Sequence, residues 1–589
     1  MSSNLEKPSV SLYVRQLTAQ PYFLESGIVC LLALVALALN WKMIREGLFF
    51  SSHDIRNHIA WLQHFSKQLS EGIWYPRWLA GTNFGYGSPT FVFYPPLVYY
   101  IGSALKLTGL NIEEVMIVLF IFPFFAAGLG FYIYGYSRWG RIASLIGALA
   151  YMTAPYITLN VSVRGALAET WSLIWIPVGL WLTDKAISHS TWRVALAIFF
   201  TVFALTHVPN LLVCTIVWLL YTLCLLLHHS WKAVAQNVTY VMIGLGIASP
   251  YLLPAIIEKS LVQTDLTRKV SGGFSANFIG IKLSEKGSFV QDYIRPIFIY
   301  ELLVSVLCLS IILFLSRQQR VRTKQAFYWM FFLLILSFLM NYHSTPIWQA
   351  SPTLQMIQFP WRLLGLFSLG EATLCGIAAH RISQSQTPQK QFFLLIILGL
   401  ILGNIIFCHR LYWDKPTFHN PGRDVSSKEF IQVQRALYEP YTDKLIDLNE
   451  FRPSLKNHDA TPSPVIGQPP VSLVSGKASI KINQWASYNR VFNVIVEETA
   501  TIKVRTYNYP AWHLYINKKP HPISVSSDGT IELTLQPGFS GVELHYLWTF
   551  PFTVGIITSL FSIATLILLW IQRLKSKRAL INEIRGAQG

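Results

Sequence analysis

Hydrophobic residues in this chain come in long runs, and short polar segments that carry Lys and Arg separate the runs. An α-helix needs about 20 apolar residues to cross the hydrocarbon core of a bilayer. The pattern therefore predicts a mainly α-helical, polytopic membrane protein of about 12 transmembrane helices. The predicted spans lie near residues 26–44, 114–136, 142–159, 168–184, 192–207, 209–228, 236–257, 296–316, 325–341, 363–380, 391–409 and 549–571.

Residues 410–548 have a different pattern, in which Pro, Asn and Lys replace the apolar runs. Short segments of alternating hydrophobicity, separated by turn residues, predict half-buried β-strands. We expect an external β-sandwich-like domain in front of the last helix. The chain then divides into a transmembrane domain (1–409), a β-rich domain (410–548) and a last transmembrane helix with a basic tail (549–589). The strands are predicted near residues 479–483, 491–496, 501–506, 531–535 and 542–546.

Composition supports a membrane protein, because 52% of the residues are hydrophobic and only 13% are charged. The formal net charge of +18 does not predict nucleic-acid binding, since the basic residues follow the predicted topology. With the N-terminus in the cytoplasm, every second loop is cytoplasmic and basic, as the positive-inside rule requires. We therefore expect a multi-pass protein with both termini in the cytoplasm and the β-rich domain outside. The basic residues include Arg138, Arg141, Lys185, Arg193, Lys232, Arg317, Lys324, Arg381, Lys390 and Arg573.

This orientation holds only if the apolar stretch from Phe91 to Leu107 does not span the membrane. The Tyr94-Pro95-Pro96 sequence interrupts the stretch, and proline breaks a helix. We predict that residues 45–113 form one long external loop, with an amphipathic helix near 55–70 and a membrane-dipping helix near 96–107. The alternative is an ordinary span, which would reverse every later loop.

Candidate chemical groups gather at the predicted outer ends of the spans. Asp54 and His58 are four residues apart and share one face of the predicted amphipathic helix. Arg164 and Glu169 occupy the next external segment. Each also has an ordinary explanation, since Asp54 could cap its helix and Glu169 could form a surface ion pair with Arg164.

Three further candidates have similar alternatives. His207 precedes Val208-Pro209, where it could be only a hydrogen-bonded residue at a helix break. Arg77 and Arg362 could anchor lipid headgroups. Glu371 differs from these residues because it lies inside an apolar span, where a carboxylate is costly and usually functional or paired. The six cysteines fall in or beside apolar runs and predict neither disulfides nor a zinc site.

Several motifs in the chain occur in an order that resembles the motif order of a known family. The motifs are His53-Asp54, Tyr75-Pro76-Arg77-Trp78, Phe93-Tyr94-Pro95-Pro96-Leu97, Arg164-Gly165 with Glu169, and Gln358-Phe359-Pro360-Trp361-Arg362. Together they are similar to the bacterial membrane proteins called 6-pyruvoyl-tetrahydropterin synthase-related, and the long first loop resembles GT-C membrane glycosyltransferases. The chain shows no pterin-synthase domain and no zinc triad, so the family title does not describe its chemistry.

The resemblance implies a protein of the bacterial inner membrane that transfers a sugar from a polyprenyl-phosphate carrier to a glycan or glycolipid acceptor at the outer face. Asp54 matches the acidic residue that acts as base or metal ligand, and Glu169 fits a second acid. Many relatives have an acidic pair where this chain has His53-Asp54, so a divalent metal is an open expectation. The residues expected to bind substrate or phosphate are Arg77, Arg164, Arg362, His58, His207, Tyr94 and Gln358.

Two other function classes stay open. A transporter or flippase is favoured by Glu371 and by the interrupted helix at His207, because broken helices line transport sites. A non-catalytic scaffold for surface-glycan assembly is the third hypothesis. A cavity at the outer surface that joins Asp54 and Glu169 favours the enzyme, whereas a path through the bilayer centre favours transport.

Overall fold

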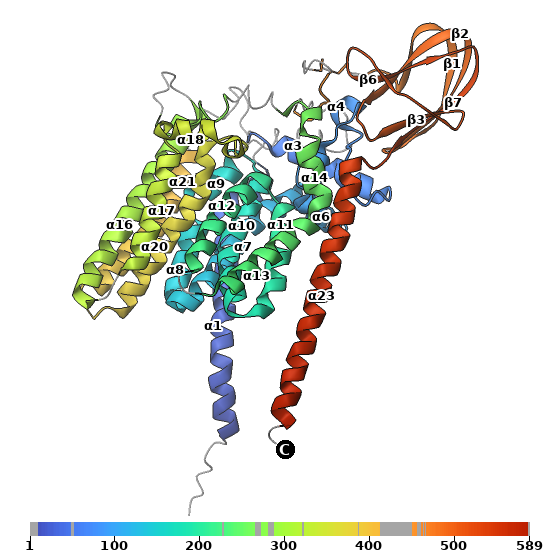
Figure 1. The fold of residues 1–589 in the computed structure, drawn as a ribbon. Helices are drawn as coiled ribbons and strands as arrows, with labels where there is room; N and C mark the ends of the chain where they lie inside the picture. The colour runs from blue at the N-terminus through green and yellow to red at the C-terminus, as the bar shows by residue number, and fades with distance from the viewer. Residues whose placement is uncertain are drawn as a thin grey trace, which may run out of the picture.

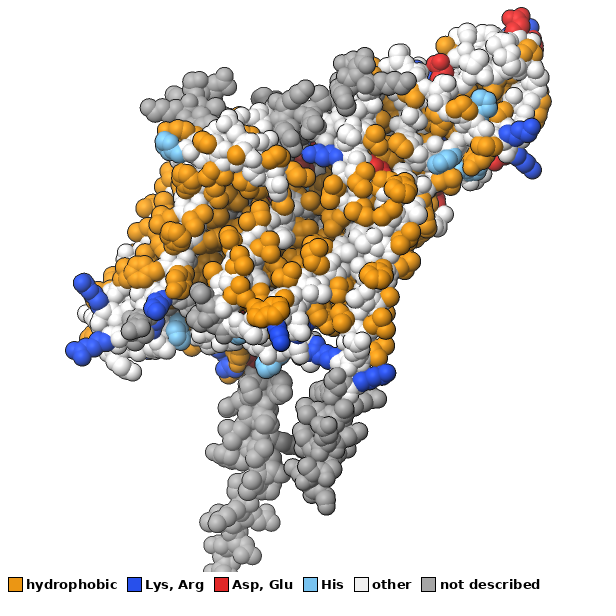
Figure 2. All heavy atoms as spheres, in the orientation of Figure 1, with side chains coloured by type: hydrophobic (Ala, Val, Ile, Leu, Met, Phe, Trp, Pro, Cys, Tyr) orange, Lys and Arg blue, Asp and Glu red, His pale blue; other side chains and the backbone are white. Residues whose placement is uncertain are grey.

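The computed structural model describes residues 10–48, 52–226, 229–264, 272–280, 288–320, 323–386, 388–412, 450–455, 461–462, 464–465 and 467–586. Long helices lie side by side in a bundle, and a β-domain projects from one end of it (Figure 1). Hydrophobic side chains form a broad band across the face shown in Figure 2, with Lys and Arg at the bundle end away from the β-domain. This distribution fits a protein embedded in a bilayer.

A helix is found at each of the predicted spans. Among the described residues, 7 helices are long and apolar enough to cross a membrane, or up to 9 if each bent pair counts as one span. The predicted number of about 12 is therefore not confirmed. The helices are α1 (Val10–Leu39), α7 (Ile112–Trp139), α8 (Arg141–Met152), α9 (Pro155–Ser162), α10 (Leu167–Ser188), α11 (Arg193–Ala204), α12 (Val208–Leu225), α13 (Trp231–Ile247), α14 (Ser249–Ile257), α16 (Arg295–Gln319), α17 (Lys324–Leu339), α18 (Thr345–Ala350), α20 (Leu364–Gln384), α21 (Lys390–Tyr412) and α23 (Phe550–Gly586).

The difference in number has a physical cause, which is that several predicted spans are short or bent. The helix pair α13 and α14 bends by 74°, and the segment after α17 bends by 79°. Helix α20 is almost entirely buried within the bundle, whereas α23 is mostly exposed. The apolar surface of α23 therefore faces lipid, and α20 forms the centre of its half of the bundle.

The first loop contains α3 (Ile55–Ser70) and α6 (Leu97–Lys106), where the sequence predicts its two helices. The shorter α4 (Thr82–Gly85) and α5 (Thr90–Phe93), which were not predicted, lie between them. The apolar face of α3 is buried, with Ile55, Ile59, Leu62 and Phe65 at most 1% exposed. Helix α6 has 10 residues, so it extends about 15 Å, which is half the thickness of a hydrocarbon core. The stretch after Phe91 therefore does not cross a bilayer as one helix.

The C-terminal domain is one antiparallel sheet rather than two packed sheets. Its strands are β1 (Val471–Trp485), β2 (Asn489–Tyr507), β3 (Trp512–Ile516), β4 (Lys519–His521), β5 (Ser524–Val525), β6 (Thr530–Leu535) and β7 (Gly538–Tyr546). The described strands follow the order β4-β3-β7-β2-β6-β5. Strands β7 and β6 pair with successive parts of one edge of β2, and β1 pairs with the opposite edge. Because the long β2 pairs with β7 along its first half and with β6 along its second, the sheet curls instead of splitting (Figure 1).

The first loop takes part in the core of this sheet. Trp78, Tyr86 and Val92 are buried among the inward-facing strand residues. The backbone N–H of Trp78 donates to the hydroxyl of Tyr488 at 3.1 Å, and the backbone N–H of Tyr507 donates to the carbonyl of Tyr86 at 2.9 Å. The β-domain therefore folds around part of the loop. Residues 414–470, whose sequence favours loops or partly helical structure, lie mostly outside the described residues.

Candidate functional site

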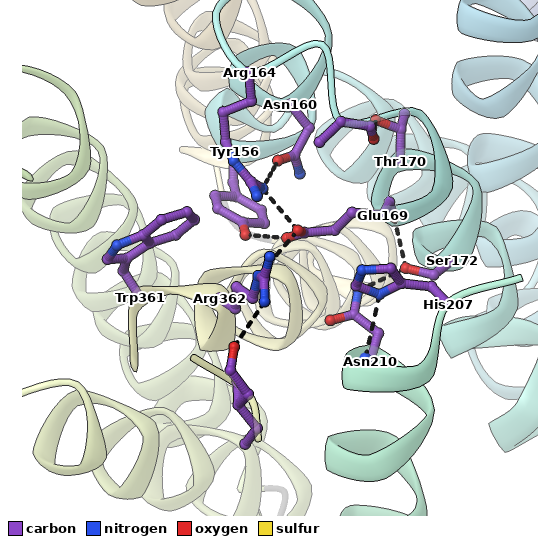
Figure 3. A network of polar contacts seen from close by, with 12 residues as sticks. Tyr156, Asn160, Arg164, Glu169, Thr170, Ser172, His207, Asn210, Trp361 and Arg362 are labelled. Carbon is purple, nitrogen blue, oxygen red and sulfur yellow. Dashed lines mark hydrogen bonds and ion pairs between the residues drawn. The ribbon is translucent and has the colours of Figure 1, made fainter. Parts of the chain in front are cut away.

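The polar centre of the bundle is the Glu169 carboxylate, near the start of α10. Its Oε2 lies 2.8 Å from Nη1 of Arg164 and 3.2 Å from Nε of Arg362, and the Tyr156 hydroxyl donates to its Oε1 at 2.5 Å. Glu169 is 2% exposed. Because Glu169 lies in the first turn of α10, its negative charge also interacts favourably with the positive end of the helix dipole. Figure 3 shows the two guanidinium groups and the Tyr156 ring converging on this one side chain.

Arg164 is held by the segment that links α9 to α10. Its guanidinium donates to the side-chain oxygen of Asn160, one helical turn earlier on α9, and lies 4.7 Å from the ring centre of Trp361. The next residue, Gly165, has φ of +61°, and a Cβ there would stand 2.6 Å from the Ser52 hydroxyl. Glycine is therefore required both for the turn and for the close approach of the first loop.

Asp54 reaches the network because the first loop docks on this turn. The backbone N–H of His53 donates to the carbonyl of Val163 at 3.1 Å, and that of Asp54 donates to the carbonyl of Arg164 at 2.9 Å. Asp54 stands at the N-cap position of α3, yet among the described residues its side chain makes no capping hydrogen bond. Helix capping therefore does not explain why a carboxylate stands at this position.

The charge environment of Asp54 links it to Glu169. Burial raises the pKa of Asp54, the positive charges of Arg164 and Arg362 lower it, and the negative charge of Glu169 raises it again. The balance leaves the pKa above the usual range of an aspartate. The structure thus brings Asp54, Glu169, Arg164 and Arg362 into one electrostatic environment.

Arg362 comes from the segment before α20. Its Nη1 donates to the carbonyl of Ile357 at 2.7 Å, and its guanidinium lies 5.0 Å from the ring centre of Phe359. Gln358 has a positive φ of 71°, and this turn directs the segment that carries Phe359, Trp361 and Arg362. The rings of Phe359 and Trp361 stack at 4.9 Å. Gln358 therefore belongs to the turn that aims Arg362.

Tyr94 and His58 lie beside this cluster on the first loop. Burial raises the pKa of Tyr94, and the charge of Asp54 raises it further. His58 is 2.7 Å from the Tyr99 hydroxyl and packs against the rings of Trp61 and Tyr94. Burial lowers the pKa of His58 to about 3, so this imidazole is neutral at physiological pH. Its contacts show that His58 supports the loop, and its expected part in substrate or phosphate binding stays a prediction.

His207 has the ordinary helix-break role that the sequence left open. It is the N-cap of α12, and its Nδ1 accepts the backbone N–H of Asn210 at 3.3 Å. The Asn210 amide donates to the Ser172 hydroxyl at 2.6 Å, and that hydroxyl donates to the backbone carbonyl of Glu169 at 2.5 Å. His207 and Asn210 thus support α10 close to Glu169 (Figure 3).

Arg77 lies elsewhere, which corrects its expected place among the phosphate-binding residues. Its guanidinium is 3.8 Å from the ring centre of Phe552 and donates to the carbonyl of Leu547 at 3.1 Å. The neighbouring Trp78 inserts into the core of the β-domain and carries Arg77 to the start of α23. Arg77 therefore joins the β-domain to the last helix.

Sequence reasoning did not find Tyr156 and Asn160, which orient Glu169 and Arg164. Both lie in a mostly apolar stretch and carry no charge, so hydropathy and charge patterns gave no signal for them. The available clue was the spacing of four residues between Asn160, near the end of α9, and Arg164 in the turn that follows.

A divalent metal shared by Asp54 and Glu169 does not fit this arrangement. The described residues contain no group of three His, Cys, Asp or Glu side chains placed to hold a metal ion. Two guanidinium groups and a hydroxyl already engage the Glu169 carboxylate. Divalent cations prefer several free oxygen ligands. The roles proposed below therefore use only the side chains of the chain.

The fold and this cluster define a polytopic membrane protein with a buried, arginine-rich polar centre where the first loop meets the bundle. The sequence of residues 91–412 matches the family described as 6-pyruvoyl-tetrahydropterin synthase related domain, membrane protein. The match covers more than half of the chain, so the protein belongs to this family, as the motif order predicted. No curated protein is matched by the sequence.

Several solved membrane glycosyltransferases are similar in structure at low sequence identity. Arabinofuranosyltransferase AftD from Mycobacteria is 14% identical with a TM-score of 0.39, and the similarity covers 67% of this chain but only 27% of AftD. ArnT from Cupriavidus metallidurans, bound to undecaprenyl phosphate, is 14% identical with a TM-score of 0.41 over 67% of this chain and 76% of ArnT. The Archaeoglobus fulgidus oligosaccharyltransferase is 12% identical with a TM-score of 0.41 over 72% and 58% of the two chains.

Proposed function

We propose that the protein is a membrane glycosyltransferase that moves a sugar from a polyprenyl-phosphate carrier to a glycan or glycolipid acceptor at the outer face of the membrane. The observation that carries the proposal is the meeting of Asp54 with the Glu169–Arg164–Arg362 network. A carboxylate and two cationic groups are what glycosyl transfer to a hydroxyl needs. Basic side chains at the bundle end away from the β-domain support an external β-domain (Figure 2).

In this proposal the arginines stabilise the leaving phosphate. A guanidinium has five N–H donors and pairs bidentately with phosphate oxygens. Glu169 is not a suitable base, because its carboxylate is already paired with the positive charges of Arg164 and Arg362 and accepts from the Tyr156 hydroxyl. Its role is to orient the two guanidinium groups and to balance their charge while the site is empty of phosphate.

Asp54 is the proposed general base for the acceptor hydroxyl. A general base works best when its pKa lies near the working pH, and burial shifts the pKa of Asp54 in that direction. Asp54 is half-buried, and we expect an acceptor hydroxyl to approach its exposed part. The proton of the acceptor hydroxyl passes to Asp54 as the oxygen attacks the sugar carbon and the phosphate leaves.

The β-domain is proposed to bind the acceptor rather than to take part in chemistry. It has a pocket of about 280 Å³ between β3 and β4, lined by residues that include Trp512, His513, Tyr515 and His521. Aromatic rings present apolar faces with polar edges, which suit sugars. We expect Tyr515→Ala to raise the KM for the acceptor and to leave kcat unchanged. An equal fall in kcat would contradict this division of roles.

The function is tested by identifying the product. Mass spectrometry of surface glycans and glycolipids should show one sugar missing in a deletion strain and restored by the wild-type gene. Purified protein in liposomes should then transfer that sugar from an undecaprenyl-phosphate donor to the acceptor. Movement of the intact lipid-linked sugar across the bilayer without transfer would replace the enzyme by a transporter. Restoration of the sugar by an Asp54→Asn protein would support the scaffold instead.

A further inference from the structure

Two further carboxylates are buried in the bundle away from the candidate site. Glu301 on α16 is 0% exposed and Glu371 on α20 is 2% exposed. The two helices pack closely, since the sulfur atoms of Cys308 and Cys375 are 3.4 Å apart across the same interface. The Ser368 hydroxyl on α20 donates to Oε1 of Glu301 at 2.9 Å. Glu371 lies three residues after Ser368 and four before Cys375, so it shares the face of α20 that packs against Glu301 and Cys308 of α16.

No positive charge balances this pair among the described residues. The titratable groups that interact with it are Tyr300 on α16, Cys375 on α20, and Cys408 and Tyr412 on α21. All four are neutral at physiological pH. Two ionised carboxylates without a cation in a membrane interior are very costly.

Three oxygen atoms of the pair are also buried without a hydrogen-bond partner among the described residues: Oε2 of Glu301 and both oxygens of Glu371. Buried polar atoms in folded proteins are nearly always hydrogen-bonded. One proton on Glu371 changes this, because a protonated carboxyl group is a donor. Its O–H can donate to Oε2 of Glu301, which pairs one oxygen of each residue and removes one of the two charges.

The pair is linked to the candidate site through α9. Helix α9 packs against α16, and the backbone N–H of Tyr156 is close enough to the Glu301 carboxylate to stabilise it. Tyr156 is the second residue of α9, where helix N–H groups have no partner within the helix. Its hydroxyl holds Glu169, and Asn160 on the same helix holds Arg164. Glu301 thus faces the first turn of the helix whose side chains orient the ion-pair network.

We infer that Glu371 binds a proton and donates it in a hydrogen bond to Glu301, and that this acid–carboxylate pair fixes the first turn of α9 and with it Glu169 and Arg164. Both glutamates are positioning residues. The inference rests on the proposed function only where transfer activity is measured. The proton itself and the order of α9 are measurable without any substrate.

The first test is infrared spectroscopy of the protein in lipid nanodiscs at neutral pH. The wild-type protein should show the carbonyl-stretch band of a protonated carboxyl group, and Glu371→Gln should remove it. Glu25→Gln is the matched control, because Glu25 is ionised and paired with Arg141 at 2.8 Å. An unchanged band in Glu371→Gln would overturn the inference.

The second test is hydrogen exchange of residues 155–164. Glu371→Leu leaves Glu301 charged without its donor, so exchange there should rise roughly tenfold or more. Glu371→Gln should keep wild-type protection, because its amide N–H₂ replaces the O–H donor. If the Leu variant does not fold, the Gln variant and the infrared band still test whether Glu371 carries a proton. Equal loss of protection in folded Leu and Gln variants would contradict the pairing.

The third test is pH dependence of stability. The folded protein keeps a proton that the unfolded chain releases above mildly acidic pH, so its free energy of unfolding should fall as pH rises. Glu371→Gln has no such proton and should reduce this slope. An unchanged slope would contradict the proton site. If all three results hold and no sugar is transferred, the proposed function fails while the proton site stands.

Discussion

Two clusters of buried carboxylates lie on either side of Tyr156, and the bundle neutralises them differently. Glu169 is balanced by Arg164 and Arg362. The Glu301 and Glu371 pair has no cation near it among the described residues, and we infer that a proton balances it. A carboxylate held by arginines leaves N–H donors available for another anion, whereas a carboxyl pair closed by a proton binds nothing else. The first cluster is therefore suited to a ligand and the second to fixing a helix.

The largest effect on stability is expected at Glu169, the carboxylate that the two arginines balance. Glu169→Gln leaves two buried guanidinium groups without their counter-charge, which costs about 3–5 kcal/mol of the free energy of unfolding. Glu25→Gln, which breaks a half-exposed ion pair with Arg141, should cost at most about 1 kcal/mol. Denaturant-induced unfolding in detergent measures both. Equal losses in the two variants would show that the burial of Glu169 has no energetic consequence.

Glu258 shows a third arrangement, in which two hydroxyl groups donate to a buried carboxylate. Its carboxylate accepts from the hydroxyl of Tyr509 and, at 2.5 Å, from that of Thr549. Glu258→Gln keeps one acceptor oxygen, so one hydroxyl loses its partner at a cost of about 1–3 kcal/mol. Because both hydroxyls belong to the β-domain side of the contact, protease sensitivity of the β-domain should rise. Thr549→Val alone should give a smaller change in protease sensitivity. If the effects of Glu258→Gln and Thr549→Val were additive in the double variant, the two side chains would not interact.

A buried group can also stay neutral without any counter-charge, as His58 does. Burial holds its pKa at about 3, whereas the unfolded chain has an ordinary pKa of 6.5. Below pH 6.5 the unfolded chain therefore binds a proton that the folded protein does not. The free energy of unfolding thus decreases as the pH is lowered. The loss from His58 is about 2 kcal/mol at pH 5 and absent at pH 8. His58→Gln should reduce the slope of unfolding free energy between pH 6.5 and 5, and an unchanged slope would contradict the burial effect.

Hydropathy and periodicity were sufficient for most of the fold. Each apolar run became a helix, and the spacing of Ile55, Ile59 and Leu62 predicted α3 within its observed bounds. The number of spans could not be predicted, because bends at α14 and after α17 depend on packing. The β-sandwich was wrong in detail because the pairing of β2 with both β6 and β7, which keeps the strands in one sheet, is a long-range property that alternation along single strands does not contain.

The candidate site could be predicted only in part. The order of motifs placed Asp54, Arg164, Glu169 and Arg362 on the same side, and the structure brings these four residues together. Arg77 was expected with them, but the insertion of Trp78 into the β-domain moves it away. Tyr156 and Glu301 sit in apolar runs, where their partners become visible only once helices are packed.

The measurement that most directly tests the account is sugar transfer by Asp54→Asn, which keeps the shape of the side chain and removes its charge. Asp528→Asn is the matched control, because Asp528 is paired with Lys503 in the β-domain. Both purified variants are compared with the wild type for transfer from an undecaprenyl-phosphate-linked sugar. We expect a loss of roughly a hundredfold or more in kcat for Asp54→Asn and wild-type turnover for Asp528→Asn. Full activity of a folded Asp54→Asn protein would contradict it.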